Sequence, residues 1–239
     1  MSEELENVVA VISCAALGTV GILANGICSI LLLQIKTYKT AFGYLTLFHS
    51  SANAILISSY LFWVAPYILW NFRELLIVNR TVGQITMIAQ AASYSSLLLL
   101  SVNRLICTYK PMRYSVLFTN RNTFFYISVM ALICITYGCV YFHTSCYHIF
   151  DRSSLEFRFS PTACGQFLSD FIDFWTSIVV LAFAGCLDLL TLAKLRLLRG
   201  DYAEEAQEMH RCLAHNQQSL QQGGESHGGS NHYHQPRNE

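Results

Sequence analysis

The sequence has little charge. Only 13% of its 239 residues are Asp, Glu, Lys or Arg, whereas 53% are hydrophobic, and the mean hydropathy is +0.38. Soluble domains usually carry about twice that charged fraction. The formal net charge is zero, so nothing suggests nucleic acid or an acidic substrate as a partner. The scarcity of charge predicts a membrane protein, with the lipid bilayer as its first partner.

Charged residues are absent from four long stretches and a shorter fifth: residues 7–35, 40–72, 81–103, 122–150 and 174–187. Each of the first four exceeds the roughly 20 residues that cross a bilayer as a helix. The fifth becomes long enough if Asp188 is tolerated within it. Apolar and polar residues do not alternate in these stretches, which disfavours strands of a β-barrel. Since backbone groups in hydrocarbon must pair within their own segment, we expect five transmembrane helices.

The first apolar stretch has none of the marks of a cleaved signal peptide. Its flank is acidic, with Glu3, Glu4 and Glu6, and no A-x-A cleavage site follows. Acidic residues are also absent from three loops that carry only basic charge. Those basic residues are Lys36, Lys39, Arg104, Lys110, Arg113, Arg121, Lys194, Arg196 and Arg199. The positive-inside rule therefore predicts an N-terminus outside the membrane.

The predicted organisation is all-α. An extracellular N-terminus (residues 1–6) precedes a transmembrane domain (residues 7–199), and a polar tail (residues 200–239) follows on the cytoplasmic side. The expected helices lie at about 7–35, 42–66, 82–107, 123–146 and 171–197. In the tail, residues 201–222 have the composition of a surface helix, and the Gly- and His-rich remainder is expected to be disordered.

Motifs for catalysis and metal binding are missing. The sequence has no G-x-S-x-G, no H-E-x-x-H and no phosphate-binding loop. Its cysteines show no metal-ligand spacing in the membrane segments, and the histidines of the tail lack a rigid frame. We therefore predict no enzyme activity, no cofactor and no metal site.

One polar motif stands at the inner end of the third predicted helix. Asn103 and Arg104 close that helix, and Pro111 and Tyr114 follow. An arginine at a membrane edge is often an anchor whose charged head reaches water. The spacing nevertheless resembles the D-R-Y…P-x-x-Y signature of rhodopsin-like G-protein-coupled receptors. Pro111 is expected to end the helix because it has no N–H to donate.

Further motifs resemble the nematode serpentine receptors of class x, which are chemoreceptor-like proteins. They are Phe42-Gly43-Tyr44-Leu45, Trp63 with Pro66, Gly83-Gln84-Ile85, Asn103-Arg104-Leu105, Pro111 with Tyr114, and Asp170-Phe171-Ile172-Asp173-Phe174. The resemblance implies that Arg104 faces a heterotrimeric G protein and that Asn25 and Asn53 pack the receptor core. It also implies an unknown small-molecule or peptide ligand and a place in the plasma membrane. Asn103 stands where the D-R-Y signature of the wider rhodopsin-like superfamily has an acid, although Asn-Arg resembles the class x pattern.

Such receptors have seven helices, so the five predicted here resemble the first five of a receptor truncated after its fifth helix. The resemblance implies a truncated chemosensory receptor-like protein. An alternative is a non-signalling membrane partner that associates with full-length receptors. A truncated chain could also be retained in the endoplasmic reticulum instead of reaching the plasma membrane. A small transporter is a third hypothesis, but the internal repeats that it predicts are not found.

Two features concern the predicted outer face. Cys146 and Cys164 bracket the loop after the fourth helix, where an oxidising compartment favours a disulfide. The alternative is that Cys146 is a lipid-buried thiol at the end of that helix. Asn79 begins a glycosylation sequon, Asn79-Arg80-Thr81, and is a candidate glycosylation site. Its place almost at the start of the third helix disfavours occupancy.

Polar residues inside the predicted helices are candidate site residues. Besides Asn25 and Asn53 they are His49, Gln84, Gln90, Tyr94 and Asp173. The alternative for each is a hydrogen bond between helices, worth about 0.6 kcal/mol on average. Asp188 lies near the inner end of the fifth helix, and we expect it to pair with Lys194 or to be hydrated.

Overall fold

The structure is a computed structural model that describes residues 3–70, 74–143 and 145–225, with only the backbone described from residue 201. It divides into two units, residues 1–191 and residues 192–239. Five helical segments are long and apolar enough to cross a membrane: Glu4–Gln34, Ala41–Trp70, Leu76–Tyr109, Asn120–Phe142 and Ala163–Gly200. The chain is thus a multi-pass, predominantly helical membrane protein.

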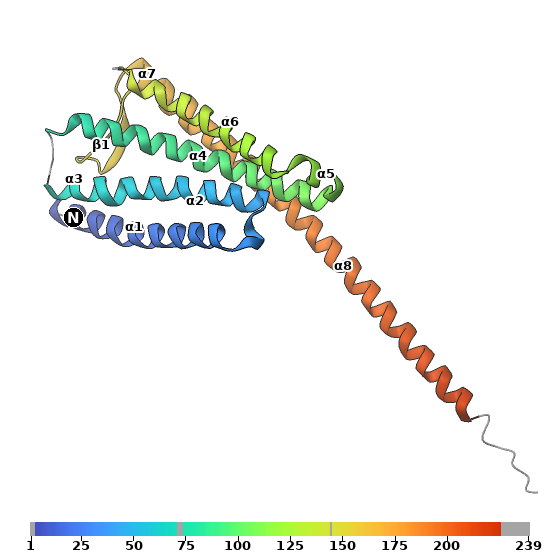
Figure 1. The fold of residues 1–239 in the computed structure, drawn as a ribbon. Coiled ribbons are helices and arrows are strands. Elements are labelled where there is room, and N and C mark those ends of the chain that lie inside the picture. The colour runs from blue at the N-terminus through green and yellow to red at the C-terminus, as the bar shows by residue number, and fades with distance from the viewer. Residues whose placement is uncertain (1–2, 71–73, 144, 226–239) are drawn as a thin grey trace, which may run out of the picture. The chain divides into compact units, whose positions relative to one another are not determined.

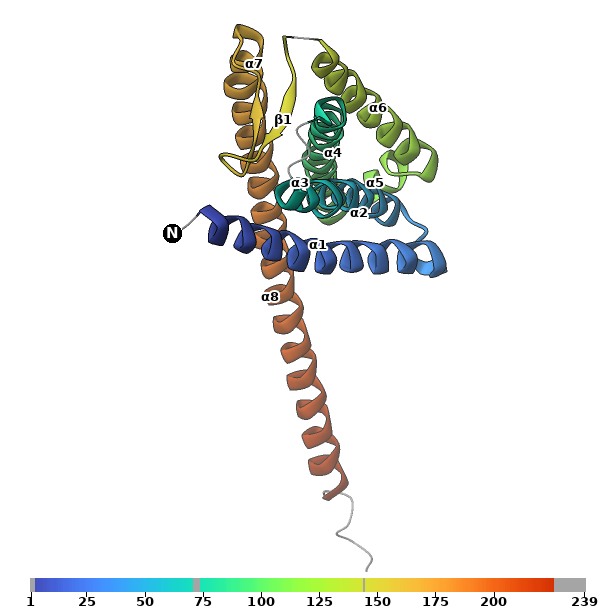
Figure 2. The same ribbon diagram turned by 90° about the vertical axis from the view of Figure 1, so that its left-hand side faces the viewer.

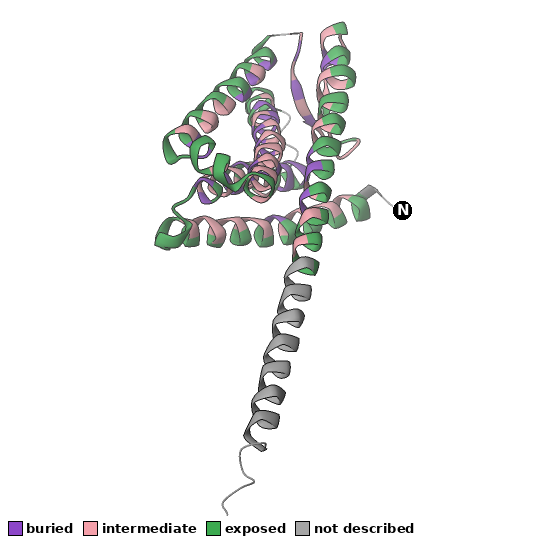
Figure 3. Ribbon diagram, turned by 90° about the vertical axis from the view of Figure 1, so that its right-hand side faces the viewer, coloured by how far each residue is buried: buried purple, intermediate pink, exposed green. Residues whose placement is uncertain are grey.

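Four of these segments form a bundle in the first unit (Figure 1). Helix α2 (Ala41–Ser59) packs between α1 (Glu3–Gln34) and α4 (Leu76–Tyr109), and α4 also contacts α6 (Asn120–Cys139). Figure 2 looks nearly along α4 and shows α6 on the far side of α4 from α1. The buried residues gather where the helices face one another (purple in Figure 3). Helix α4 is the most buried span and α1 the least.

The outer surfaces of the spans are apolar. Large hydrophobic side chains such as Leu17, Leu23, Ile133 and Phe183 are exposed on them. An apolar surface of this kind is stable in a bilayer and would aggregate in water. Small residues at contacts let the helices approach closely. A Cβ added to Gly138 of α6 would come within 2.1 Å of the Ile88 side chain on α4.

Proline shapes the second span. Its helix passes through a π-helical turn, η2 (Tyr60–Val64), before continuing as α3 (Ala65–Trp70). Pro66 has no N–H to donate, and its ring would clash with the carbonyl four residues earlier. The wider turn relieves that clash, and the amide of Ala65 donates to the carbonyl of Tyr60, five residues back.

Short elements connect the spans at the end where Arg104 lies. The 3-10 helix η1 (Lys36–Tyr38) joins α1 to α2, and α5 (Pro111–Leu117) joins α4 to α6. Pro111 occupies the first turn of α5, where its missing N–H costs nothing. The hydroxyls of Thr40 and Thr119 accept backbone amides at the starts of α2 and α6.

A β-hairpin lies at the opposite end of the bundle, after α6 and the 3-10 helix η3 (Val140–Phe142). Strands β1 (His148–Asp151) and β2 (Glu156–Phe159) pair antiparallel, with Phe150 opposite Phe157. Strand β1 packs on α4. A Cβ on Gly83 of α4 would come within 2.0 Å of the His148 carbonyl oxygen, so only glycine permits this approach.

The last span begins with α7 (Ala163–Phe167), passes through a second π-helical segment, η4 (Leu168–Trp175), and continues as α8 (Thr176–Glu225). The first unit includes α8 as far as Thr191. In the second unit, α8 continues as helix to Glu225, over the residues 201–222 for which the sequence predicts a surface helix and three residues beyond them. Its Ala, Glu, Gln and Leu residues favour helix. Residues 226–239 of the expected disordered tail lie outside the described residues.

Several predicted boundaries need correction. The third span begins at Leu76 instead of about 82 and ends at Tyr109, while the fourth covers 120–142 instead of 123–146. The third span starts earlier because Arg80, near its first residues, donates hydrogen bonds to backbone carbonyl groups at the end of the fourth span. The charge therefore does not have to lie outside the helix. The fourth stops earlier because the apolar residues around Phe150 are buried in the hairpin, not in lipid. The hairpin itself was not predicted.

Candidate functional site

Arg104 forms an ion pair with another span. Its Nη2 atom lies 2.9 Å from Oδ2 of Asp188 on α8 and also donates to the Ser101 hydroxyl at 3.3 Å. Both charged side chains are about two-fifths exposed, at 39% and 41%. The expected pairing of Asp188 with Lys194 is therefore wrong. Lys194 was favoured because it is near in sequence, but the helices bring Arg104 to the carboxylate.

The pair is incompletely satisfied. Arg104 Nε, Asp188 Oδ1 and the side-chain amide nitrogen of Asn103 are buried and lack hydrogen-bond partners. The Tyr109 hydroxyl makes a second link between these spans by donating to the Leu190 carbonyl at 3.2 Å. Since buried polar groups without partners are costly, this end of the bundle is under-satisfied compared with a typical protein interior.

The other motif residues lie apart from Arg104. Tyr114 on α5 packs into an apolar cluster with Leu45, Leu100 and Phe118, and its ring stacks on Phe118 with 5.4 Å between centroids. Pro111 only starts α5. The structure therefore brings Asn103 and Arg104 together at the end of α4. It uses Pro111 and Tyr114 to fold the following loop against the bundle.

A polar network joins the first three spans. The Ser50 hydroxyl on α2 donates to Asn25 on α1, and the amide of Asn25 donates to the Gly21 carbonyl. Asn53 accepts from Ser93 on α4 at 2.7 Å and donates to Nε2 of His49 at 3.0 Å. With Nε2 accepting, Nδ1 of His49 carries the proton and donates to Ser93 and Ser96. Asn25 and Asn53 thus hold helices together.

A cavity opens between α4, α6 and the start of the last span. Its volume is about 210 Å³, and aromatic and aliphatic side chains line most of it. Two of the polar candidates meet there, because Gln90 on α4 donates to Asp173 on η4 at 3.2 Å. Tyr94 and Tyr137 also line the cavity. Gln84 is not part of it and instead donates to the Tyr141 carbonyl at 2.7 Å.

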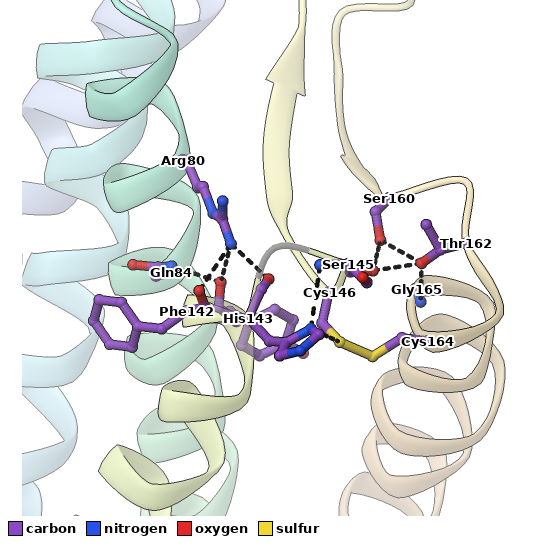
Figure 4. The surroundings of a disulfide bond; sticks show 11 residues. Arg80, Gln84, Phe142, His143, Ser145, Cys146, Ser160, Thr162, Cys164 and Gly165 are labelled. Carbon is purple, nitrogen blue, oxygen red and sulfur yellow. Dashed lines mark hydrogen bonds between the residues drawn. A yellow bond between two sulfur atoms is a disulfide. The ribbon is translucent and has the colours of Figure 1, made fainter.

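A disulfide fastens the hairpin end. Cys146, just before β1, is bonded to Cys164 on α7 (Figure 4). Cys146 is therefore not a free thiol at the end of the fourth helix. Around the bond, the Thr162 hydroxyl caps α7, and Ser160 donates to the Ser145 carbonyl at 2.7 Å. These bonds fix the loop to the start of the last span.

Arg80 holds the same region from the α4 side. Its guanidinium donates to the carbonyl oxygens of Tyr141, Phe142 and His143, which end η3 (Figure 4). The guanidinium also lies 5.7 Å from the centre of the Tyr147 ring. Arg80 is thus a structural anchor, and the sequence reasoning missed it because charge alone gave no partner.

Asn79, the candidate glycosylation site, is buried. Its side chain is 1% exposed. The amide accepts from the Phe150 backbone and the Trp63 indole, each at 3.1 Å, and donates to the Phe150 carbonyl at 2.9 Å. The amide thus pairs with β1 as a neighbouring strand would. Because α4 starts at Leu76, before the sequon, Asn79 lies within the helix and its amide faces β1. The buried amide has no room for a glycan in this conformation.

His148 lies on β1 between the helices and the hairpin aromatics. It is 4% exposed, and its Nδ1 approaches the Gly83 carbonyl at 3.4 Å. Burial lowers the pKa of His148 to about 4, against the smaller opposing effect of that hydrogen bond. The imidazole is therefore neutral at pH 7.

Sequence reasoning names Asp188 of this site with the wrong partner, and it does not name Tyr137. An acid at position 188 within an apolar stretch was the available signal for an interhelical pair. Among the residues that the structure describes, no group of three or more His, Cys, Asp or Glu side chains could hold a metal ion.

Comparison with known proteins adds one match. The family model described as "Serpentine type 7TM GPCR chemoreceptor Srx" matches residues 16–223. No curated protein matches the sequence. The matched region contains all five candidate spans apart from the first residues of α1, and with them the Arg104–Asp188 pair and the Asp173 cavity.

Proposed function

The chain belongs to the Srx family of serpentine seven-helix G-protein-coupled chemoreceptors, and from this premise we propose that it detects a small molecule in the Asp173 cavity. The observation that carries the proposal is the placing of two polar sites on one continuous helical segment. Asp173 stands at the cavity on η4, and Asp188 pairs with Arg104 further along α8. A change at the cavity has a direct helical route to that pair.

The Arg104 end is the surface proposed to face the G protein. The support is chemical as well as by family. Arg104 is half-exposed, its partner acid is on a different span, and both groups keep buried atoms without partners. A pair of this kind breaks at lower cost than a fully satisfied one, so two states of nearly equal free energy are available to a ligand.

The orientation is part of the same proposal. The N-terminus and the hairpin lie outside, and the Arg104 end faces the cytoplasm. Two independent features support this arrangement. The loops at the Arg104 end carry only basic charge, and the disulfide lies at the hairpin end, where an oxidising compartment would allow it to form.

The test of receptor function is nucleotide exchange on heterotrimeric G proteins by the full chain in lipid nanodiscs. We expect exchange above the protein-free rate, and its loss in Arg104→Ala. Arg121→Ala is the matched control, because Arg121 is an exposed cation at the same end and forms no ion pair with any residue that the structure describes. Equal exchange by the chain, by both variants and by empty nanodiscs would remove the coupling role.

A second candidate is a non-signalling partner of other receptor chains. It is favoured by the exposed apolar face of α8 in the first unit, which includes Ile178, Val179, Phe183 and Leu189. Such a face can pack on a helix of another chain as well as on lipid. Co-purification with another Srx receptor, together with no exchange activity in nanodiscs, would favour this candidate over the first.

A further inference from the structure

Asp173 places an acidic side chain, which is negatively charged when ionised, in a cavity between candidate membrane spans. Its carboxyl group accepts a hydrogen bond from the neutral amide of Gln90, at 3.2 Å. Within the described residues, no Lys, Arg or His forms an ion pair with it. Arg80 and Arg104 both have other partners, since Arg80 donates to carbonyl groups and Arg104 pairs with Asp188.

This charge is expensive in such surroundings. Removing a carboxylate from water costs several kcal/mol unless an opposite charge compensates for it. One amide hydrogen bond offsets only part of that cost. Intramembrane acids of this kind therefore mark binding or transport sites more often than helix contacts.

The rest of the cavity indicates what would balance the charge. The rings of Tyr94 and Tyr137 and the aliphatic side chains of Ile172 and Val180 line it beside the carboxylate. Aromatic faces attract cations as well as apolar groups. A volume of about 210 Å³ accommodates a small molecule but not a peptide.

We propose that this cavity binds a small organic ammonium ion, with its charged nitrogen at Asp173 and its apolar or aromatic body against Tyr94, Tyr137 and Val180. The proposal rests on the proposed receptor function and specifies its ligand class. Gln90 acts as a positioning residue, because its amide holds one oxygen of the carboxylate toward α4. An inorganic cation would leave the apolar part of the cavity unused.

The backbone at Asp173 gives a second, independent observation. Asp173 belongs to the π-helical segment η4, which lacks a proline that would explain it. A π-helical turn changes the direction in which side chains point and is often found at functional sites. Here it carries one acid, Asp173, to the cavity, while Asp170 in the same segment is exposed and lines a different surface pocket.

The two acids make a matched pair of variants. The full chain is placed in lipid nanodiscs at pH 7, and equilibrium binding of 2-phenylethylamine, isopentylamine and tetramethylammonium is measured. The neutral analogue 2-phenylethanol is measured in parallel. We expect at least one cation to bind saturably and 2-phenylethanol to bind at least about tenfold more weakly than its amine.

The variants then assign the charge. Asp173→Asn should weaken binding of the cation at least about tenfold, Asp173→Glu should retain most of it, and Asp170→Asn should leave it unchanged. Gel filtration of each variant verifies that it remains folded. Binding that survives in Asp173→Asn, or that falls equally in Asp170→Asn, would overturn the proposal. So would the absence of saturable binding by all three cations.

Failure here is distinguishable from failure of the receptor role. If 2-phenylethanol binds as well as the amine, and Asp173→Asn does not alter either, then the ligand class is wrong. The receptor proposal would still stand if G-protein nucleotide exchange depended on Arg104. If ammonium binding is intact but nucleotide exchange does not depend on Arg104, the chain binds the ligand without coupling to a G protein through that residue.

Discussion

Arg104 and Asp188 link α4 to α8 through one ion pair, with 2.9 Å between Nη2 and Oδ2. Among the ion pairs of the described residues, this one alone joins two membrane spans. Asn103 beside Arg104 carries no charge, so the arginine takes its carboxylate from another helix. A contact between helices is more easily coupled to helix movement than a contact within one helix.

Asp188→Asn should therefore raise basal G-protein activation. The substitution removes the charge that holds Arg104 against α8, which favours states in which the arginine is free. An interhelical pair with about two-fifths of each side chain exposed is worth about 1 kcal/mol, so a rise of a few-fold is expected. The measurement is nucleotide exchange in nanodiscs. Asp170→Asn serves as the control, and a fall in basal exchange would contradict the idea that the Arg104–Asp188 pair holds the protein in its inactive state.

Breaking the disulfide should loosen the hairpin without unfolding the bundle. Cys146→Ser opens a loop of sequence separation 18, and the chain-entropy argument gives a loss of about 3 kcal/mol. Hydrogen exchange should then increase across β1, β2 and α7 but not in α2. Cys186→Ser, which removes an exposed free thiol, is the matched control. Equal protection in both variants would show that Arg80 and Asn79 suffice.

Acid should destabilise the hairpin through His148. The imidazole has a pKa near 6.5 when unfolded and about 4 when folded. The unfolded segment thus binds the proton first, so stability is complete above about pH 6.5 and falls as the pH is lowered toward 4. The loss reaches about 3 kcal/mol at the acid end.

Hydrogen exchange of β1 between pH 7 and pH 4, corrected for the intrinsic rate, measures this effect. His148→Phe should remove most of the dependence, because Phe retains stacking on Phe157 but does not titrate. Asp151 lies in the same hairpin in both proteins, so the difference between the two proteins isolates His148. An unchanged pH profile in the variant would assign the effect to other groups of the hairpin.

The Asn79 sequon should carry no glycan in the folded protein. Treatment with a glycosidase is expected to leave the electrophoretic mobility of the chain unchanged. Asn79→Ala should nevertheless destabilise the hairpin by about 3 kcal/mol, since three hydrogen bonds of about 1 kcal/mol each are lost. Thr81→Ala removes the sequon but keeps those bonds, so it should behave as wild type. A mobility shift on glycosidase treatment would contradict the buried position.

The orientation predicts opposite locations for the chain ends. An epitope tag at residue 3 should be accessible to antibody on intact cells, and a tag at residue 230 should require permeabilisation. The reason is the basic charge of the loops at the Arg104 end. Labelling of both tags on intact cells would place both chain ends outside, which requires an even number of spans and would contradict the five expected.

The sequence by itself determined the membrane class, the five candidate spans and the family. These features follow from composition and from the length of uncharged stretches, because hydrocarbon imposes the same requirement on every backbone group regardless of neighbours. The motifs from Phe42 to Asp173 identify the family because residue spacing along the chain can be read from the sequence without knowing the fold. The boundaries failed where a charge such as Arg80 found partners, or where apolar residues such as Phe150 were buried in protein.

Only the tertiary structure decided which polar groups meet. Arg104 and Asp188 are separated by 84 positions, and Gln90 and Asp173 by 83. No local rule relates such pairs, because their distance depends on how α4 packs against the last span. The same packing turned Asn79 from a surface sequon into a buried partner of β1. Polar groups in apolar segments must either form hydrogen bonds or serve a function, and the sequence shows where such groups are. The packing of the helices determines which of them pair with one another.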